Sequence, residues 1–315
     1  MTRTADDLQK TLAGPVVLDG VGVHSGKPAR LVLRSAEADS GILFQRVDRA
    51  DDVVVPATFR SVGATELCTV LADPTGATIA TVEHLMAALS ALGVDNALVE
   101  VDGPEVPIMD GSSAAFVAAI EAGGLVTLGR RRRYLKVVKP VRVDHGDAFG
   151  ELEPWPTSRF EVTIDFDNAV IGRQSIEFDL SARFFRNELS RARTFGRVAE
   201  VERLWAMGFA LGSSLENSVA IADDRVLNPE GLRFADEFVR HKALDAVGDL
   251  ALAGLPILGL YRSFKGGHRI NVGVLKTLFA DPSTYEIVEA APRRESGRAE
   301  IAAGLAVAAF GPDRR

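Results

Sequence analysis

The chain has very little cysteine and no long apolar run. Its 315 residues include one cysteine, Cys68, so no internal disulfide can form, and a reducing compartment fits. The first ten residues, MTRTADDLQK, lack the apolar segment of a secretory signal. The most apolar stretch, 250–260, contains two glycines and a proline and is shorter than the roughly 18 residues that a membrane span needs. We expect no transmembrane segment.

An excess of positive charge is also missing. The 36 Lys and Arg residues against 43 Asp and Glu residues give a net charge of −7, which argues against general nucleic-acid binding. The one basic run, 130–133, is better interpreted as a solvated segment between domains. The hydrophobic share of 47% and the charged share of 25% are typical of a globular protein, and the length suggests two domains.

Periodicity and turn signals divide the chain into two halves. In the first half we expect strands at 16–18, 29–33, 53–56 and 96–101, and helices at 82–92 and 112–122. Thr81 is the expected cap of the first helix, and Gly93 is its expected end. The second half predicts strands at 134–139, 159–166, 175–178 and 257–261, and helices at 198–207 and 233–253. We predict domains at 1–128 and 129–288, followed by a tail at 289–315.

The most informative polar spacing lies in the second half. His241 and Asp245 are four residues apart, so on a helix they share one face, and Asp249 lies one turn further along. This spacing can present an imidazole and a carboxylate to one cation. It is also the spacing of an ordinary surface ion pair, so by itself it leaves both interpretations open.

Two other segments offer candidate polar groups. Catalytic zinc usually keeps three protein ligands, and His84 with His241 and Asp245 would complete such a set, leaving Glu83 as general base. The alternative is that Glu83 only complements the helix dipole and that His84 is a core histidine. At 264–268, two glycines precede His268 in a loop that either approaches a ligand or forms a plain turn.

Several competing motifs are absent or fail. The sequence contains no HExxH, Walker A, GxSxG or CxxC motif. GVGVHSG at 20–26 looks like a dinucleotide loop, but its third glycine is one residue late, so we reject that interpretation. An isolated cysteine in an apolar stretch, such as Cys68, is more often a core residue than a nucleophile.

Taken together and in order, the motifs resemble the UDP-3-O-acyl-N-acetylglucosamine deacetylase family. The matching segments are GVGVHSG at 20–26, TVEHL at 81–85, PIMDGS at 107–112, SRARTFG at 190–196, DRVLN at 224–228, GLRF at 231–234 with its continuation to 249, and GH at 267–268. The similarity runs from about residue 8 to residue 288. The resemblance implies an α+β fold of two similar domains, each a sheet with helices on one face, with the helices sandwiched between the two sheets.

The same resemblance implies the site and its chemistry. It implies one catalytic Zn²⁺ held by His84, His241 and Asp245, with Glu83 as general base. The other implied catalytic residues are His268, as electrostatic stabiliser and general acid, Asp249, as its partner, and Thr194, near the developing oxyanion. The implied substrate-binding positions are Lys242, Lys265, Phe195 and Phe166.

The implied reaction is hydrolysis of the 2-N-acetyl group of a UDP-linked, 3-O-acylated glucosamine, in lipid A biosynthesis. A monomer in the cytoplasm of a Gram-negative-type bacterium is the expected setting. The alternatives are another zinc amidohydrolase and a non-catalytic protein that binds a UDP-sugar or an acyl chain. Arg197 and Ala148 depart from residues common in the family. We expect Arg197 to shape acyl selectivity or else to face solvent, and Ala148 to alter nucleotide contacts.

Overall fold

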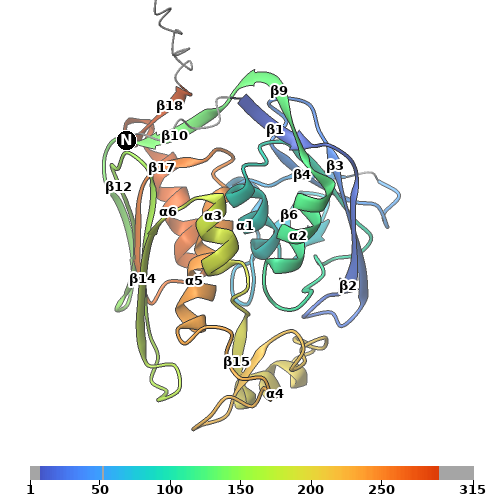
Figure 1. Cartoon of the computed structure of the whole chain (residues 1–315), viewed down its shortest axis with the longest axis vertical. Helices are drawn as coiled ribbons and strands as arrows, with labels where there is room; N and C mark the ends of the chain where they lie inside the picture. The colour runs from blue at the N-terminus through green and yellow to red at the C-terminus, as the bar shows by residue number, and fades with distance from the viewer. Residues whose placement is uncertain (1–7, 52, 291–315) are drawn as a thin grey trace, which may run out of the picture.

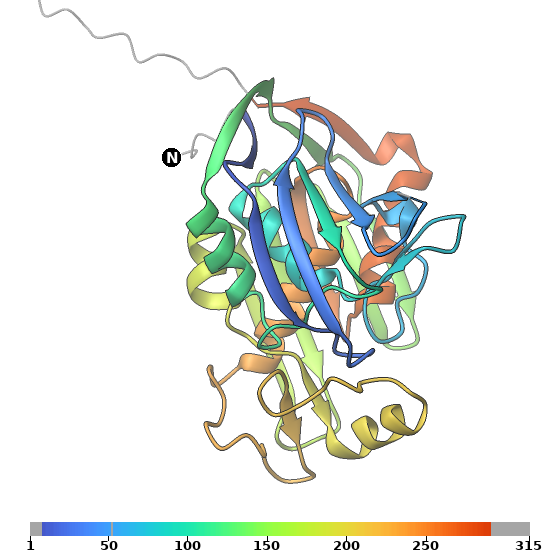
Figure 2. The same cartoon turned by 90° about the vertical axis from the view of Figure 1, so that its right-hand side faces the viewer.

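Two β-sheets form the outer layers of the molecule, and helices fill the space between them. The computed structural model describes residues 8–51 and 53–290. Figure 1 shows the helices between one sheet that contains β2 and β3 and another that contains β14 and β17. In Figure 2 the first sheet faces the viewer, in front of the helices. The predicted α+β sandwich is therefore confirmed. Within the described residues, no helix is both long and apolar enough to cross a membrane.

The first sheet has five strands in the order β2-β3-β8-β4-β5. Its neighbours run antiparallel except for β4 and β8, which are parallel. Along β3, Ala29, Leu31 and Leu33 are buried and the residues between them are more exposed, as expected for a sheet with one face on the core. The strands are β2 (Val16–Val21), β3 (Pro28–Ser35), β4 (Ile42–Arg46), β5 (Val54–Pro56) and β8 (Ala97–Val101).

The second sheet has seven strands, with β17 at its centre. This strand pairs with β12 antiparallel and with β10 and β13 parallel. Phe160, Val162 and Ile164 alternate along β13 and are buried. The strands are β10 (Arg133–Val137), β11 (Val141–His145), β12 (Ala148–Glu153), β13 (Ser158–Asp165), β14 (Arg173–Asp179), β17 (Ile257–Phe264) and β18 (Tyr285–Glu289). Within the two large sheets, the sequence patterns missed β4, β11, β12 and β18.

The two central helices are buried on nearly every side. In α1, nine of ten residues are buried, and in α5, twelve of fifteen. A helix surrounded by other elements needs apolar residues all round, which the alanine- and leucine-rich sequence of α1 largely supplies, whereas α5 also buries polar and charged residues. The helices are α1 (Glu83–Leu92), α2 (Ala114–Gly123), α3 (Ala182–Phe184), α4 (Val198–Ala206), α5 (Glu237–Ala251) and α6 (His268–Ala280), with short turns η1 (Phe59–Ser61), η2 (Phe185–Leu189) and η3 (Pro282–Thr284).

Three two-stranded sheets complete the fold. The pair β15 (Phe195–Arg197) and β16 (Val219–Ile221), with α4 between them in the chain, lies at the bottom of the molecule in Figure 1. The other pairs are β1 (Leu8–Leu12) with β9 (Leu125–Arg131), and β6 (Leu71–Ala72) with β7 (Thr78–Ile79).

The basic run at 130–133 is part of a strand rather than a free linker, since β9 ends at Arg131 and β10 begins at Arg133. Three of its four arginines are exposed, as predicted, and Arg132 is half-buried against Asp95. The first sheet uses only residues 16–101 and the second only residues 133–289. A division near residue 128 stays a prediction, and of the predicted tail, 291–315 lies outside the described residues.

Two local predictions were wrong. Thr81 does not cap α1, because its backbone has φ +59° and its hydroxyl donates instead to the buried carboxylate of Glu105 at 3.0 Å. His268 does not lie in a turn; it is the first residue of α6, after Gly267. The end of α1 is as predicted, since Gly93 adopts φ +77° there.

The contact between α1 and α5 depends on a glycine. A Cβ atom at Gly248 would lie 2.0 Å from the carbonyl oxygen of Glu83. The backbones of the two helices therefore meet where Glu83 and His84 begin α1. A larger residue would push the two helices apart.

We predict that Gly248→Ala lowers the free energy of unfolding by about 1–3 kcal/mol, because the added methyl meets backbone that cannot rotate away. Urea denaturation measures the change. The matched control is Gly273→Ala in α6, where the new Cβ would lie 3.5 Å from Val143, an ordinary contact. That change should be neutral or should stabilise by up to about 1 kcal/mol. Equal effects of the two substitutions would contradict the proposed role of Gly248.

Candidate active site

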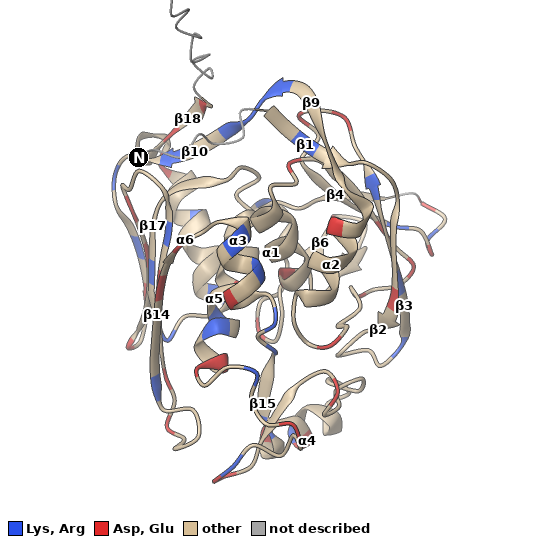
Figure 3. Ribbon diagram, viewed as in Figure 1, with Lys and Arg blue, Asp and Glu red and all other residues tan. Residues whose placement is uncertain are grey.

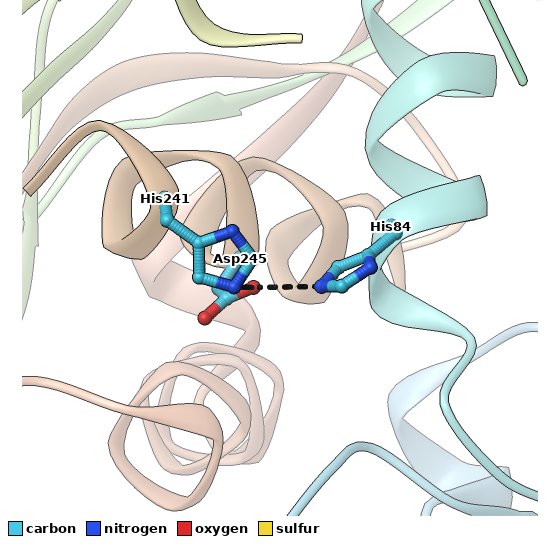
Figure 4. Close-up of side chains that lie close together, drawn as sticks. All are labelled: His84, His241 and Asp245. Carbon is cyan, nitrogen blue, oxygen red and sulfur yellow. Dashed lines mark ion pairs between the residues drawn. The ribbon is translucent and has the colours of Figure 1, made fainter. Parts of the chain in front are cut away.

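Three ligand-type side chains converge between α1 and α5. His84 is the second residue of α1, and His241 and Asp245 lie one turn apart on α5. Nε2 of His84 is 3.6 Å, and Nε2 of His241 is 3.4 Å, from Oδ1 of Asp245. Figure 4 shows the three side chains pointing toward one another, and one potential ligand atom from each lies within 4.8 Å of the other two. The structure brings the whole predicted ligand set together.

The chemistry of this group suits a divalent cation. Nδ1 of His241 donates to the carbonyl oxygen of Ala192 at 3.1 Å, which leaves the lone pair on the Nε2 that faces Asp245. Burial lowers the pKa of His241 to about 3, so the ring is neutral at pH 7. Oδ1 of Asp245 is buried without a hydrogen-bond partner among the described residues. A buried carboxylate oxygen in that state is costly unless a cation binds it, so these residues fit a metal ion.

A second polar group lies beside the first. Nε2 of His268 is 3.7 Å from Oε1 of Glu83, and Nδ1 of His268 donates to Oδ2 of Asp249 at 2.8 Å. Burial by itself would lower the pKa of His268, but the carboxylates of Asp249 and Glu83 raise it to about 9. Burial raises the pKa of Glu83, so this carboxyl group binds a proton more readily than an exposed glutamate does. The pair can therefore exchange protons with a bound molecule.

Asp249 is held by three donors, two from α6 and one from the loop before β6. Besides His268, its carboxylate accepts from the Thr69 hydroxyl at 2.6 Å and from the Asn271 amide at 2.8 Å. Tyr261 donates in turn to the Asn271 side-chain oxygen. The backbone N–H of Thr69 donates to Oε2 of Glu83 at 3.1 Å, which ties the base to the same network. This network keeps both members of the proton-exchanging pair in one arrangement.

These groups are buried in a molecule whose charges lie mostly outside. Figure 3 shows many of the Lys, Arg, Asp and Glu residues along the outer strands and loops, with some also on the helices, α5 among them. Glu83, Asp245 and Asp249 are each at most 3% exposed. Buried carboxylates are expensive to keep, so their concentration at one place points to function.

A cavity of 450 Å³ opens over the two polar groups. Eight of the predicted site residues line it: Glu83, His84, Thr194, Phe195, His241, Lys242, Asp245 and His268. Much of the remaining wall is apolar: Leu67, Ile108, Val198, Val201, Leu204, Trp205, Leu215 and Leu227. A larger groove of 890 Å³ is lined by arginines and apolar residues and contains none of these eight. The smaller cavity is therefore the candidate active site, because the predicted site residues line it and do not line the larger groove.

The predicted substrate-binding residues divide into two groups. Phe195 and Lys242 line the cavity, and the Lys242 ammonium donates to Oδ2 of Asp245 at 2.8 Å. Burial opposes the charge of Lys242, but Asp245 outweighs it and raises the pKa of the ammonium. Lys265 and Phe166 are not among the lining residues: Lys265 pairs with Asp147 at 2.6 Å, and the ring of Phe166 lies 5.8 Å from that of Phe195.

Arg197 and Ala148, the two residues that differ from those common in the family, do not line the cavity. Arg197 is not a lining residue, although Gly196 and Val198 on either side of it are. Its side chain is 42% exposed, and its guanidinium lies 3.9 Å from the carboxylate of Glu200. The geometry favours the solvent-facing alternative over a role in acyl selectivity. Ala148, in β12, also lies outside the cavity.

Sequence reasoning missed several residues of the site. Thr69 and Asn271 hold Asp249, but neither belongs to a recognisable motif. Asn271 follows His268 by three residues, a spacing that would have indicated a shared helix face had α6 been predicted. His24 and Cys68 also line the cavity. Burial raises the pKa of the Cys68 thiol well above its ordinary value, which fits the predicted core role rather than a nucleophile.

Two histidines and an aspartate, next to an acid–base pair in a partly apolar cavity, are typical of a metal-dependent hydrolase. Comparison with known families makes the assignment more specific. Residues 9–280 match the family described as UDP-3-O-acyl N-acetylglycosamine deacetylase. The chain belongs to this family.

Several relatives carry the corresponding name. The chain is 55% identical over 283 residues to proteins named UDP-3-O-acyl-N-acetylglucosamine deacetylase from Brucella ovis and Brucella canis. It is 54% identical to the protein of that name from Brucella melitensis biotype 2. Each comparison covers 90% of this chain and 99% of the relative. The resemblance inferred from the sequence motifs is thus confirmed.

We predict that Asp249→Asn lowers the pKa of His268 from about 9 toward the ordinary value of 6.5, because the substitution keeps an oxygen acceptor but removes the negative charge. NMR titration of the histidine ring in metal-free protein measures the shift. The control is Asp144→Asn, which removes one charge from the exposed end of β11. An unchanged His268 titration in Asp249→Asn would disprove the electrostatic coupling.

Proposed function

We propose that this chain hydrolyses the 2-N-acetyl group of UDP-3-O-(3-hydroxyacyl)-N-acetylglucosamine and releases acetate, the committed step of lipid A biosynthesis. The main support is the position of the Glu83–His268 pair, beside the three ligand-type residues and at the polar end of a largely apolar cavity. Family membership and the names of the Brucella relatives support the substrate class. A coupled assay for acetate released from this substrate is the direct test.

His84, His241 and Asp245 would hold one catalytic Zn²⁺. Bound zinc supplies a water whose pKa falls from about 15.7 toward about 7, together with positive charge beside the substrate amide. The protein's contribution is to orient the ligands: Ala192 fixes the ring of His241, and Lys242 fixes one oxygen of Asp245.

Glu83 would act as general base. An amide is a poor electrophile, so its attacking water must lose a proton. Oε2 of Glu83 is held by the N–H of Thr69, and Oε1 faces His268. Since burial raises the pKa of this carboxyl group, Glu83 can accept the proton and retain it for later transfer.

His268 would be the electrostatic stabiliser and general acid. Held by Asp249 and positively charged at neutral pH, it can stabilise the negative charge that develops on the amide oxygen. It can then protonate the nitrogen, so that a neutral amine leaves. Thr194 lines the same cavity and would add a polar contact near the developing oxyanion.

The cavity suits the two unlike parts of the substrate. The apolar wall formed by Val198, Val201, Leu204 and Trp205 would enclose the acyl chain. We place Phe195 and Phe166 next to this wall, and Lys242 and Lys265 toward the diphosphate, where their charges can act. We further propose that the enzyme works as a monomer in the cytoplasm of a Gram-negative bacterium.

We predict one Zn²⁺ per chain in the purified protein, because the described residues contain a single such group of histidine and acidic side chains. A His84→Ala/His241→Ala double variant should lose the metal and the activity together, since only one ligand remains. Elemental analysis and the acetate assay measure both. The control His145→Ala changes an exposed histidine outside the cavity and should keep the full zinc content.

The same measurements separate the alternative functions. Zinc-bound protein that releases no acetate from this substrate would indicate another zinc amidohydrolase. Protein that binds the substrate without zinc and without turnover would indicate a non-catalytic binding protein. Full metal content in the double variant would show that the ligand set is wrong.

We predict a bell-shaped dependence of kcat/KM on pH. Activity rises with pH as Glu83 ionises, at a higher pH than for an exposed glutamate because burial raises its pKa. Activity then falls as His268, whose pKa is raised to about 9, loses its proton. A bound cation would shift both limbs, which are therefore macroscopic values of the coupled site.

Single variants assign the two limbs. Glu83→Ala should lose the acidic limb and His268→Ala the basic limb, each with kcat reduced by about 10²–10⁴-fold while zinc stays bound. Rate profiles measured from acid to alkaline pH, with zinc content determined in parallel, test this. A complete bell of unchanged shape in both variants would mean that the base and the acid have been misassigned. Loss of zinc from His268→Ala would make His268 a ligand.

A further inference from the structure

His24 lines the cavity, but nothing in the proposed mechanism uses it. It lies in the loop 22–26, between strands β2 and β3. Its imidazole ring packs against the ring of Phe209 in a T-shaped contact, with 6.2 Å between the centroids and 82° between the ring planes. His268 lines the same cavity. His24 therefore shares the cavity with the Glu83–His268 pair and also contacts the segment that follows α4.

The backbone of this loop is fixed on both sides. The buried carboxylate of Glu105 accepts from the N–H groups of His24 and Ser25, each at 2.9 Å. The His24 carbonyl accepts from the N–H of Leu211 at 3.2 Å. A Cβ atom at Gly22 would lie 2.2 Å from Oε2 of Glu105, so only glycine fits there. Such a loop holds the imidazole ring at a defined position.

The ring itself has polar atoms without partners. Neither ring nitrogen of His24 forms a hydrogen bond within the described part of the chain; Nδ1 is closed off from solvent, whereas Nε2 is not. Burial lowers the pKa of the ring, against the attraction of Glu105, so it is neutral at pH 7. A buried N–H without an acceptor costs about 1–3 kcal/mol. The favoured tautomer therefore carries its proton on Nε2, as a donor available to a ligand in the cavity.

We infer that His24 donates this hydrogen bond to an oxygen at the head of the 3-O-acyl group, either the ester carbonyl or the β-hydroxyl. This inference rests on the proposed function. The reacting amide is on sugar carbon 2 and the ester is on the neighbouring carbon 3, so the ester lies between the acid–base pair and the start of the apolar chain. His24 lines the same cavity as His268 and contacts, through Phe209, the segment whose Trp205 and Ala210 line the cavity. It is thus a specificity-determining residue that selects acylated substrates with a polar head.

The test uses His24→Phe in the zinc-loaded enzyme, because phenylalanine keeps a ring against Phe209 but has no donor. Three substrates of equal chain length are compared: the 3-hydroxyacyl ester, the ester without the hydroxyl, and a 3-O-alkyl ether that lacks both oxygens. For the 3-hydroxyacyl ester, kcat/KM should fall about 3- to 10-fold, the effect of one neutral hydrogen bond. For the ether it should stay unchanged.

The middle substrate identifies the acceptor. A deficit that disappears when the hydroxyl is removed assigns the β-hydroxyl, and a deficit that persists assigns the ester carbonyl. His24→Gln, which offers an amide N–H, should recover part of the loss, and it keeps the test usable if the phenylalanine variant folds poorly. The control is His145→Phe, a histidine outside the cavity. Zinc content and thermal unfolding are measured for every variant.

A loss of the same size on all three substrates, or no loss on any, would overturn the inference. The first outcome would make His24 a structural or general catalytic residue, and the second would make it an ordinary wall residue. Failure of the proposed function is recognised separately, because the wild-type enzyme would then release no acetate from the 3-hydroxyacyl ester.

Discussion

The close contact of helices α1 and α5 is the constraint on which the site depends. Gly248 has no side chain, so α5 approaches the first residue of α1 more closely than any other residue type would permit. His84 comes from one helix, and His241 and Asp245 from the other. A displacement of about 1 Å between the helices would separate the ligand atoms of the proposed zinc site, since zinc ligands lie close to 2 Å from the metal. The packing of α1 against α5 in the core therefore also determines the geometry of the site.

The same interface carries an unusual concentration of charge. Glu237, His241, Asp245 and Asp249 follow one another at four-residue intervals along α5, and all are at most 2% exposed. Each has a polar partner: Glu237 binds the buried Arg193, and Asp249 binds His268, Thr69 and Asn271. Such groups add little to stability compared with an apolar core. Their retention fits the proton transfer and metal binding proposed for this site.

The cavity combines a polar part with an apolar wall. At one end, acid, base and ligand groups are held by hydrogen bonds; at the other, the segment between β15 and β16 supplies an apolar wall. Loop 22–26 is tied to Glu105, which also accepts from Thr81, and to Leu211 in the segment between β15 and β16. An amphiphilic substrate matches this arrangement, because its sugar and its chain need opposite surroundings.

The sequence by itself indicated the fold class, the family and the candidate ligand set, because seven motifs in one order are a property of the chain that needs no tertiary structure. The four-residue spacing of His241 and Asp245 is likewise a local property. The sequence also indicated the end of α1 at Gly93, where only a left-handed backbone was needed. It could not decide between an ion pair and a metal site. That required His84, 157 positions earlier, and only the tertiary contact at Gly248 brings it there. The conformation of Thr81 and the network around Asp249 were likewise decided by partners distant in sequence, since a hydrogen bond to a buried carboxylate outweighs a local capping preference.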